Sequence, residues 1–567
     1  MRRLLLLAVC ASCARSAPAP IPATADTVDL VIAGTTDVHG WLRGWDYFGN
    51  VADTTRGLAR VATMVDSIRG ANPDRVVVVD AGDDLQGTPI TAIALRDSLG
   101  ANPIIAAMNT LRYDAAVIGN HEFNYGLGYL NRAISQASFP FLAANVYFPD
   151  GRHAYTPWVM LARRGVHVAV VGGTTPGAML WDRDKLRGRV EVRDIVPSVR
   201  VAVEEARQRG ANVVVVVLHS GLNEPASYDT VATELPSENV SARVAREVPG
   251  IDVIVYGHTH KELADTTIGT TLLTQPRNWA GSLSVTRLQV VRAPGGWIVV
   301  RRRGGVLRAR GRPEQESVVA AIAQAHERTV EYTRAPIGTT TAAWRADSAR
   351  VVDTPIIDFV LEVQRRVSGA DLASTSAFNL NARFGPGAIT MGDVARLYPY
   401  DNNVLRAVRI SGRQLREYLE QSAKYFRQSV PADSLIDPAI PGFNFDIVSG
   451  ADYVIDLSQP IGSRITSLSR NGRAIADTDS FTLALNDYRQ NGGGGYAMLR
   501  GAPLVYDQQQ VIRQLLIDEV QRRGTLRPED YFARNWRLAP DSMAGVAYRA
   551  MRRLPFDRPE TPARTTP

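Results

Sequence analysis

Cysteine is almost absent from this sequence. Its only two cysteines, Cys10 and Cys13, lie within the first 20 of 567 residues. The rest of the chain can therefore form no disulfide and offers no thiolate ligand to a metal. Serine chemistry lacks a motif too, because no G-x-S-x-G segment follows a strand-like run. These absences exclude a disulfide-stabilised fold and disfavour covalent catalysis by cysteine or serine.

Lysine is scarce as well. It occurs only as Lys185, Lys261 and Lys424, so arginine carries almost all of the positive charge. The formal net charge is +7, but no block of basic residues interleaved with aromatics occurs, which argues against a nucleic-acid polymer as partner. No apolar stretch after the first residues approaches the roughly 18 residues of a membrane span. A mildly basic surface suits small anionic substrates.

The first 20 residues have the pattern of a secretory signal peptide. Arg2 and Arg3 supply the positive end, and Leu4 begins an apolar core too short to span a bilayer. Cleavage after Ala14 would release an exported soluble protein. A lipid anchor on one of the two cysteines is the alternative, although neither follows a well-formed lipobox. The sequence therefore predicts export to the periplasm, the outer envelope or the medium.

The length and the order of elements predict two domains. Strand-like runs alternate with helical patterns over 28–315, which indicates a layered α/β domain. Residues 316–335 have apolar residues at helical spacing, so we expect one connecting helix there. A second α/β domain is expected over 336–540. A flexible tail is expected at 545–567, where Arg and Pro recur.

Five short motifs each follow a strand-like run. They are TTDVHG at 35–40, DAGDDLQG at 80–87, GNHEF at 119–123, VLHSG at 217–221 and GHTH at 257–260. Ligands gather outside the carboxyl ends of strands in α/β sheets, so the Asp, Asn and His of these motifs are expected at one edge. Imidazole and carboxylate ligands suit divalent Zn, Mn, Fe or Co. We predict a two-metal centre in which Asp83 bridges ions about 3.5–4 Å apart.

The motifs, in this order, resemble those of the calcineurin-like metallophosphoesterases. Three further segments, LYPYDN at 397–402, GFNFDIVSGADYVIDLSQPIGSRI at 442–465 and LNDYRQNGGGGY at 485–496, resemble the C-terminal domain of the 5'-nucleotidase family. The resemblance implies an α/β fold with an N-terminal layered sandwich and a C-terminal α/β substrate domain. It also implies hydrolysis of nucleotide phosphate esters by a metal-bound hydroxide. The activity would be that of a 5'-nucleotidase, of a 2',3'-cyclic-nucleotide 2'-phosphodiesterase/3'-nucleotidase, or of both.

The resemblance assigns roles to single residues. The first metal would be held by Asp37, His39 and His260 and the second by Asn120, His219 and His258, with Asp83 shared and Asp80 and Asp84 less favoured for that bridge. His121 would lie beside the reacting phosphate as a proton donor, the alternative being a histidine packed under its loop. The family commonly has Asp where this chain has Asn124. Asn124 can orient His121 through a hydrogen bond but brings no charge.

The second domain would select the substrate. Tyr400 and Tyr496 match the two aromatics that sandwich the base in this family, the alternative being two ordinary half-buried tyrosines. Stacking is worth about 1–3 kcal/mol per base and tolerates any base. The N-G-G-G-I-R segment of typical 5'-nucleotidases is replaced here by 374–390. Arg383 and Arg350 are then the candidate phosphate or ribose contacts, unless they are surface arginines.

Two other functions stay open at this point. A related di-metal hydrolase would act on a UDP-sugar, another phosphomonoester or a thiosulfate-type ester, and the stacking tyrosines would then have no purpose. A non-catalytic binding protein would carry a decayed site. Every expected metal ligand is present as a side chain, which argues against that decay.

Overall fold

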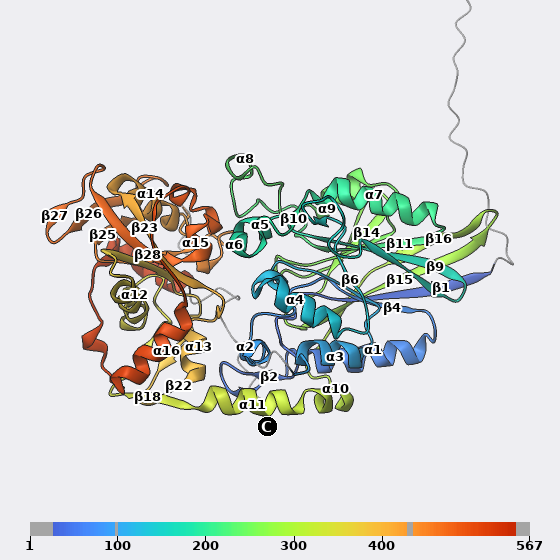
Figure 1. Cartoon of the computed structure of the whole chain (residues 1–567), viewed down its shortest axis with the longest axis horizontal. Helices are drawn as coiled ribbons and strands as arrows, with labels where there is room; N and C mark the ends of the chain where they lie inside the picture. Colours follow the sequence, from blue (N-terminus) through green and yellow to red (C-terminus); the bar gives the residue numbers. More distant parts are fainter. Residues whose placement is uncertain (1–25, 97–99, 428–434, 552–567) are drawn as a thin grey trace, which may run out of the picture.

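The structure is a computed structural model that describes residues 26–96, 100–427 and 435–551. Two α/β domains lie side by side, the N-terminal domain on the right of Figure 1 and the C-terminal domain on the left. The predicted signal peptide lies outside the described residues. Among the helices of the described ranges, none combines the length and the apolar character needed to cross a membrane.

The N-terminal domain is a sandwich of two sheets. The first has the strand order β16-β15-β1-β4-β5-β6, with β17 beside β15, and the second has the order β13-β14-β12-β11-β9-β8. The first sheet consists of β1 (Thr27–Thr35), β4 (Val76–Asp80), β5 (Ala115–Val117), β6 (Phe141–Leu142), β15 (Ser282–Ala293), β16 (Gly296–Arg303) and β17 (Val306–Arg308). The second consists of β8 (Trp158–Arg163), β9 (Val166–Thr174), β11 (Val213–His219), β12 (Val253–Tyr256), β13 (Leu263–Ile268) and β14 (Thr271–Gln275).

Helices cover the outer faces of both sheets. The helices of this domain are α1 (Leu58–Ala71), α2 (Pro89–Arg96), α3 (Pro103–Leu111), α4 (Gly126–Ser135), α5 (Ala178–Trp181), α6 (Arg183–Leu186), α7 (Ile195–Gln208), α8 (Thr230–Thr233) and α9 (Ser241–Glu247). Short strand pairs, β2 (Trp45–Asp46) with β3 (Val51–Ala52) and β7 (Val146–Tyr147) with β10 (Glu191–Val192), complete the domain.

The central strands are apolar throughout because both of their faces are buried. In β1, Leu30 and Ile32 belong to the core between the two sheets, whereas Val31 and Ala33 belong to the core under α1 and α3. Successive side chains of a strand point to opposite faces, so a strand covered on both sides needs apolar residues at every position. The same rule explains the valine run of β11, which packs under α7 on its outer face.

The C-terminal domain is built on a five-stranded sheet with the order β24-β20-β28-β23-β29. Its strands are β18 (Pro336–Thr340), β19 (Trp344–Arg345), β20 (Leu372–Ser376), β21 (Arg383–Phe384), β22 (Gly387–Thr390), β23 (Val404–Ser411), β24 (Asp446–Ser449), β25 (Asp452–Asp456), β26 (Ile465–Arg470), β27 (Arg473–Ala474), β28 (Ser480–Asn486), β29 (Leu504–Val511), β30 (Thr525–Leu526) and β31 (Trp536–Ala539). Its helices are α12 (Pro355–Ser368), α13 (Met391–Leu397), α14 (Gly412–Ala423), α15 (Asp487–Gln490), α16 (Ile512–Arg523) and α17 (Asp541–Met551). Capping boxes at Thr390 and Ser411 begin α13 and α14, because each satisfies free N–H groups of a first turn.

A buried ion pair lies at the centre of this domain. Arg489 Nε donates to Asp446 Oδ2 (2.8 Å) and Nη2 donates to Asp446 Oδ1 (2.7 Å). Ser374, Ser376 and Tyr418 also donate to the Asp446 carboxylate. Burial alone would raise the pKa of Asp446, but the Arg489 charge outweighs it and lowers the pKa. This pair fixes the segment that carries the glycine-rich motif.

The connection between the domains differs from the single helix that the sequence predicts. The chain forms α10 (Glu316–Ala321) and α11 (Ala323–Arg334), with a break at Ile322. The break arises because Ile322 turns into the core of the N-terminal domain, where it is fully buried together with Val318. Helix α11 packs against α2 of one domain and α13 of the other, along the lower edge of Figure 1.

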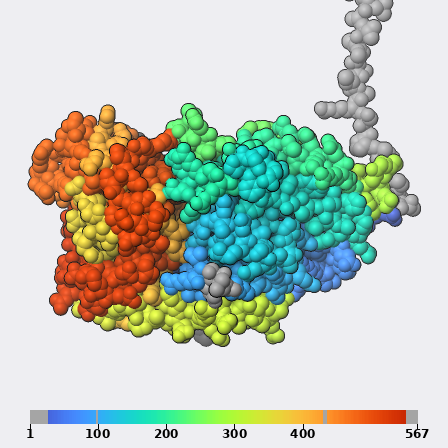
Figure 2. Space-filling model, viewed as in Figure 1, coloured from blue at the N-terminus to red at the C-terminus, as the bar shows by residue number. Residues whose placement is uncertain are grey.

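Order extends further toward the C-terminus than predicted. The tail was expected to begin at residue 545, but 545–551 belong to α17, where Ala547 is buried in the core of the C-terminal domain. Residues 552–567 lie outside the described residues. In Figure 2 the two domains touch directly, and the green region around α5 and α6 meets the orange-red C-terminal domain.

Two buried carboxyl groups pack together in α12 and the segment before it. Asp358 accepts from Ala533 N and Asp353 accepts from Asn535 N, each at 3.0 Å. Burial, and after it the charge of Asp353, raises the pKa of Asp358 from 3.8 to about 8. The folded state therefore binds this proton more tightly than the unfolded state. Its contribution to stability is complete below the unfolded pKa and is lost as pH rises through the folded pKa.

Replacing Asp358 by Asn should remove this pH dependence. An amide stays neutral, so we expect Asp358→Asn to differ little from wild type at pH 4 and to become the more stable protein toward pH 9. The expected difference is on the order of a few kcal/mol. Thermal unfolding from pH 4 to 9 measures it, with Asp452→Asn, an exposed position of the same domain, as control. A difference from wild type that is the same at every pH would contradict the prediction.

Candidate metal centre

The seven residues predicted to bind metal lie together at one edge of the sandwich. Asp37, His39, Asp83, Asn120, His219, His258 and His260 follow the carboxyl ends of β1, β4, β5, β11 and β12. Five of them adopt a left-handed backbone, namely Asp37 (φ 50°), His39 (50°), Asp83 (66°), His258 (80°) and His260 (55°). That conformation lets the chain turn sharply just after a strand, at a cost of about 1–2 kcal/mol for each non-glycine residue. The fold therefore stores strain where these side chains gather.

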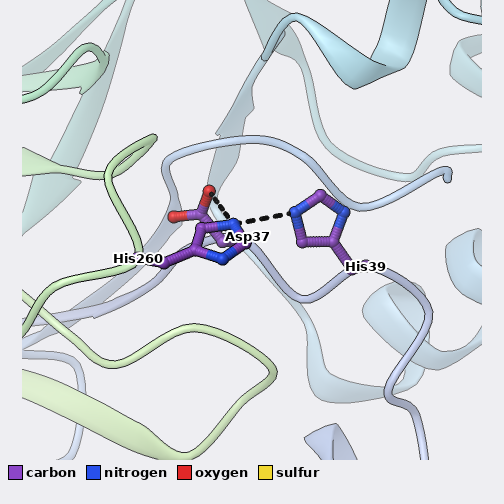
Figure 3. A group of neighbouring side chains, drawn as sticks. All are labelled: Asp37, His39 and His260. Atoms are coloured by element: carbon purple, nitrogen blue, oxygen red, sulfur yellow. Dashed lines mark hydrogen bonds and ion pairs between the residues drawn. The ribbon is translucent and has the colours of Figure 1, made fainter. Parts of the chain in front are cut away.

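The first group consists of Asp37, His39 and His260 (Figure 3). Asp37 Oδ2 accepts from Thr36 Oγ1 (2.7 Å) and from the His258 backbone N–H (3.1 Å). Asp37 Oδ1 is buried, has no hydrogen-bond partner among the described residues, and lies 3.3 Å from His260 Nε2. His260 Nε2 in turn lies 3.1 Å from His39 Nε2. An orphaned carboxylate oxygen and two ring nitrogens thus converge on one point.

Backbone contacts fix the tautomer of His39. Its Nδ1 donates to the Gln86 carbonyl (2.7 Å), so in the neutral ring Nε2 carries a lone pair. Burial lowers the pKa of His39 to about 3, which keeps the ring neutral. Burial alone would raise the pKa of Asp37, but the facing His260 outweighs it and lowers the pKa to about 2. A neutral imidazole and an ionised carboxylate are the protonation states that a divalent cation binds.

The second group consists of Asp83, His219 and His258, with Asn120 beside it. His219 Nδ1 donates to the Ala81 carbonyl (2.7 Å), so Nε2 turns its lone pair toward Asp83 Oδ2 (3.0 Å) and Asn120 Oδ1 (3.1 Å). Three acceptors that face one another repel unless a proton or a metal ion lies between them. Burial would lower the pKa of His219, yet the Asp83 charge raises it to about 10. The site therefore requires a cation at Nε2, and a divalent metal meets that requirement.

Asp83 belongs to the second group and also to a third candidate group, with His39 and His121, which shares His39 with the first group. Its Oδ1 accepts from the His121 backbone N–H (2.8 Å), which leaves Oδ2 directed to the histidines. Oδ2 lies 3.9 Å from His39 Nε2 and 3.9 Å from His121 Nε2, besides its contact with His219. No side chain larger than hydrogen fits at Gly119, where a Cβ would lie 2.2 Å from Asp83 Oδ1.

Two buried acids that the sequence did not single out hold the ligands in place. Glu122 accepts from the backbone N–H groups of Asp83 (2.8 Å), Asp84 (2.6 Å) and Gly119 (2.7 Å), so it ties the loop after β4 to the loop after β5. Glu238 Oε2 accepts from His258 Nε2 (3.1 Å), which leaves Nδ1 of that ring for the metal group. A carboxylate behind a ligand histidine is the usual way to fix its ring. Glu122 stands inside the GNHEF motif, whereas no motif marks Glu238.

Asp80 and Asp84 are in none of the candidate metal groups of the described residues. Asp80 accepts from Thr35 Oγ1 (2.5 Å) and Gly82 N (2.6 Å), behind the ligand loop. Burial, followed by the charge of Asp80, raises the pKa of Asp84 well above its ordinary value. Asp83, by contrast, occurs in two candidate groups, and its role as the bridge between two ions stays a prediction.

Tyr400 lies at the interface between the domains. It is half-buried, with its ring against Phe378 (5.1 Å), and the next residue, Asp401, contacts the N-terminal domain. Asp401 accepts from Tyr125 Oη (2.7 Å) and from Gln86 Nε2 (3.3 Å). Gln86 is also the residue whose carbonyl holds His39. The loop that bears Tyr400 is therefore connected by hydrogen bonds to the first metal group.

Tyr496 differs from the prediction that it stacks on a base. Its ring is fully buried under Arg489 (4.2 Å) and against Tyr418 (4.4 Å), and its hydroxyl donates to the Asn444 carbonyl (2.9 Å). Tyr488, in the same motif, is half-buried and packs on Gly493, where a Cβ would lie 2.5 Å from the ring.

The segment of Tyr488 lies at the domain interface, because its neighbours Gln490 and Asn491 line a pocket together with Arg183 and Asp184 of the N-terminal domain. Burial raises the pKa of Tyr488, an effect that the charge of Arg489 opposes and the charge of Glu238 increases. Tyr488 is partly exposed beside this interface, whereas Tyr496, the residue that the sequence favoured, is buried.

The two candidate arginines lie in different surroundings. Arg350 is buried, and its Nη2 donates to the Ala377 carbonyl (2.8 Å) inside the C-terminal domain. This differs from a ligand contact, because the guanidinium is already used within the core. Arg383 is exposed on β21. A substrate contact of Arg383 stays a prediction.

Comparison with known proteins matches both halves of the chain. The family model for a calcineurin-like phosphoesterase matches residues 30–262, and that for the 5'-nucleotidase C-terminal domain matches residues 336–501. The 2',3'-cyclic-nucleotide 2'-phosphodiesterase/3'-nucleotidase of Salmonella typhimurium is 31% identical over 91% of this chain and 90% of that protein. The trifunctional nucleotide phosphoesterase protein YfkN of Bacillus subtilis is 31% identical over 92% of this chain, which spans only 40% of the length of that protein.

A solved structure has the same architecture. A protein of Staphylococcus aureus described as a 5'-nucleotidase, in complex with alpha-ketoglutarate, superposes with a TM-score of 0.78 and 25% identity. The match covers 90% of this chain and all of the other. The predicted fold class, an N-terminal metallophosphoesterase sandwich followed by a C-terminal 5'-nucleotidase domain, is confirmed.

Replacing Asp83 by Asn should disrupt the two candidate metal groups that contain it. The amide brings no negative charge to the point where His39 and His219 face it, so we expect metal content to fall and nearly all turnover to be lost. Metal analysis after reconstitution with Mn²⁺ and circular dichroism measure the loss and the integrity of the fold. The matched control is Asp84→Asn, at the next residue of the same loop, which belongs to none of the candidate metal groups of the described residues. Equal metal content in Asp83→Asn and wild type would contradict the assignment.

Proposed function

Since the chain belongs to the 5'-nucleotidase family of calcineurin-like metallophosphoesterases, we propose that it hydrolyses nucleotide phosphate esters at a centre of two divalent ions. One observation carries this proposal: the loop of Tyr400 contacts Gln86, and Gln86 holds the metal-group residue His39. A single small molecule can therefore contact metals at one end and an aromatic ring at the other. A nucleotide has this shape, with an anionic phosphate and a flat base.

The side chains of the centre are positioned before any substrate arrives. Asp37 and Asp83 each have one oxygen held by a backbone N–H group and the other directed inward. Backbone carbonyls fix His39 and His219 so that Nε2 of each points inward. Two bound divalent ions would supply a nucleophile from water at neutral pH and neutralise charge on the phosphoryl oxygens. Imidazole and carboxylate ligands suit Zn, Mn, Fe or Co.

His121 is the proposed proton donor. Its Nε2 lies 3.9 Å from Asp83 Oδ2 and so faces the space beside both metal groups, while Nδ1 contacts Asn124. The leaving oxygen of a phosphate ester needs a proton, and a histidine at this place delivers it from Nε2. Tyr400 and Tyr488 are the proposed contacts of the base, since both are partly exposed and lie in segments that contact the N-terminal domain.

We assign the substrate to the 2',3'-cyclic nucleotides and their 3'-monophosphate products. The support is that relatives bearing that name are 30% and 31% identical over about nine-tenths of the chain, whereas a snake venom 5'-nucleotidase is 24% identical. Export of the protein is also proposed, on the charged and apolar pattern of residues 1–20.

A substrate panel tests the proposal. Purified protein reconstituted with Mn, Zn or Co is assayed on 2',3'-cyclic, 3'- and 5'-nucleotides, UDP-glucose, thiosulfate-type esters and an aryl phosphate. The 2',3'-cyclic nucleotides should give the highest kcat/KM. Turnover of the non-nucleotide esters alone would overturn the assignment, and absence of turnover with every metal would overturn catalysis.

His121→Ala should separate metal binding from chemistry. We expect metal content to stay at the wild-type level, because other residues supply the ligands, while kcat falls about 10²–10⁴-fold. Metal analysis and steady-state kinetics on the best substrate of the panel measure both quantities. Wild-type kcat in the variant would show that His121 only packs beneath its loop.

Replacing Tyr400 and Tyr488 together by Ala should weaken nucleotide hydrolysis selectively. Stacking is worth about 1–3 kcal/mol per base, so kcat/KM for nucleotides should fall at least about 10-fold. An aryl phosphate that needs only the metals should be hydrolysed almost as before. Tyr496→Phe, which keeps the buried ring, is the matched control and should change neither substrate. Equal losses on both substrates would mean that the two tyrosines are structural.

A further inference from the structure

A buried carboxylate lies behind the proposed proton donor, two hydrogen bonds away. Asn124 Oδ1 lies 2.6 Å from His121 Nδ1, and Asn124 Nδ2 donates to Asp182 Oδ2 at 2.8 Å. Asp182 stands between α5 and α6, 58 residues from Asn124 along the chain, and is 3% exposed. Lys185 Nζ donates to its other oxygen at 2.7 Å. Hydrogen bonds therefore join Lys185, Asp182 and Asn124 in that order, and Asn124 contacts the His121 ring.

The carboxylate decides which way the Asn124 amide points. An amide has a donating end and an accepting end, and these can exchange by rotation of the side chain. A carboxylate that forms an ion pair with Lys185 only accepts hydrogen bonds. Asn124 must therefore turn its NH₂ group to Asp182, which leaves the amide oxygen for His121.

The amide in turn decides where His121 keeps its proton. An amide oxygen only accepts, so His121 Nδ1 must carry hydrogen, and in the neutral ring the lone pair lies on Nε2. Nε2 is the atom that faces the metal groups. A ring held in the opposite tautomer would have no lone pair at Nε2 and could not take up there the proton that it later delivers. Loss of the correct tautomer alone can cost a catalytic histidine several orders of magnitude in rate.

We propose that Asp182 is a positioning residue for His121 and acts through Asn124, so that the pair Asn124–Asp182 does the work of a single carboxylate beside the histidine. The chain carries Asn at position 124, where the resembling family commonly has Asp. The carboxylate of Asp182 instead acts on His121 through the Asn124 side chain. The proposal rests on the function proposed for His121. It assigns a role to a residue that no motif of the sequence marks.

Asp182 is not one of the charged residues of the protein surface, because it is buried. It lies under the domain interface, where Asp184 pairs with Arg406 of the C-terminal domain. Burial raises the pKa of Asp487 in that domain to about 6, an effect that Lys185 opposes and Asp182 increases. Asp182 thus has two hydrogen-bond partners, Lys185 on its own segment and Asn124.

A rescue experiment tests the proposal. In Asp182→Ala the amide of Asn124 is free to rotate, so kcat should fall about 10- to 100-fold with KM and metal content unchanged. In Asn124→Asp, the new carboxylate would face the Asp182 carboxylate across the 2.8 Å that a hydrogen bond now spans, so kcat should fall as well. The double variant Asp182→Ala/Asn124→Asp places a single carboxylate directly beside His121 and should recover most of the lost kcat. If Asp182 had a purely structural role, the losses of kcat in the two single variants would add in the double variant.

Two further variants keep the test informative if Asp182→Ala folds poorly. Asp182→Asn has nearly the same shape but can also donate, so it should fix the Asn124 amide less well and lose kcat with the same melting temperature. Glu191→Gln, at an acid that is 55% exposed and pairs with Arg193, should keep wild-type kcat. A double variant no faster than Asp182→Ala, or an Asp182→Asn variant with wild-type kcat, would overturn the proposal.

Nitrogen NMR of the histidine rings gives a readout that does not depend on turnover. In Zn-loaded protein labelled with ¹⁵N-histidine, the His121 signals, assigned by their loss in His121→Ala, should show hydrogen on Nδ1. They should shift toward the other tautomer in Asp182→Ala and return in the double variant. Hydrogen on Nε2 in the neutral wild-type ring would overturn the proposal. The Nδ1–H tautomer in a protein inactive on the whole substrate panel would overturn the proposed function and leave the positioning role standing.

Discussion

Two carboxylates that the fold buries without a complete set of partners are the constraint on which the candidate metal site depends. Asp37 and Asp83 lie at the end of a sandwich whose core is mostly aliphatic, and each has one oxygen that the backbone does not satisfy. An isolated charge in such a place costs several kcal/mol unless a cation lies against it. His39 beside them adds a lone pair rather than positive charge, because burial lowers the pKa of its ring. The loops at the strand ends, left-handed at five ligand positions, therefore make sense as a frame for divalent ions.

The frame is held by the chain itself. Glu122 binds three N–H groups of two different loops, and the carbonyls of Gln86 and Ala81 set the tautomers of His39 and His219. The apolar strands provide the stability that offsets the strain of the left-handed turns. In the C-terminal domain the Arg489–Asp446 ion pair has a role similar to that of Glu122, since it fixes the segment that carries Tyr488. Both domains thus place polar anchors directly behind the groups that face the substrate.

The sequence alone predicts most of this frame, and the parts it misses share one cause. The ends of the strands can be predicted, because a run of valines indicates a buried strand and the Asp, Asn or His that follows marks its carboxyl end. Tyr488 and Tyr496 belong to one glycine-rich segment, and only the buried Arg489, paired with a residue 43 positions away, decides which ring is inside. The helix break at Ile322 follows from tertiary burial and not from helix propensity. No sequence motif predicts the role of Asp182, because its partner Asn124 is 58 residues away in the chain.

The turn between α5 and α6 contacts more of the molecule than its length suggests. Trp181 stacks on His258 (5.7 Å between ring centres), Asp182 holds Asn124, and Asp184 pairs with Arg406 across the domain boundary. Three neighbouring residues thus contact a metal-group histidine, Asn124 and the C-terminal domain. A movement of the C-terminal domain would act on this turn through the ion pair between Asp184 and Arg406. Kinetic effects of substitutions between residues 181 and 185 therefore report on chemistry and on domain position at the same time.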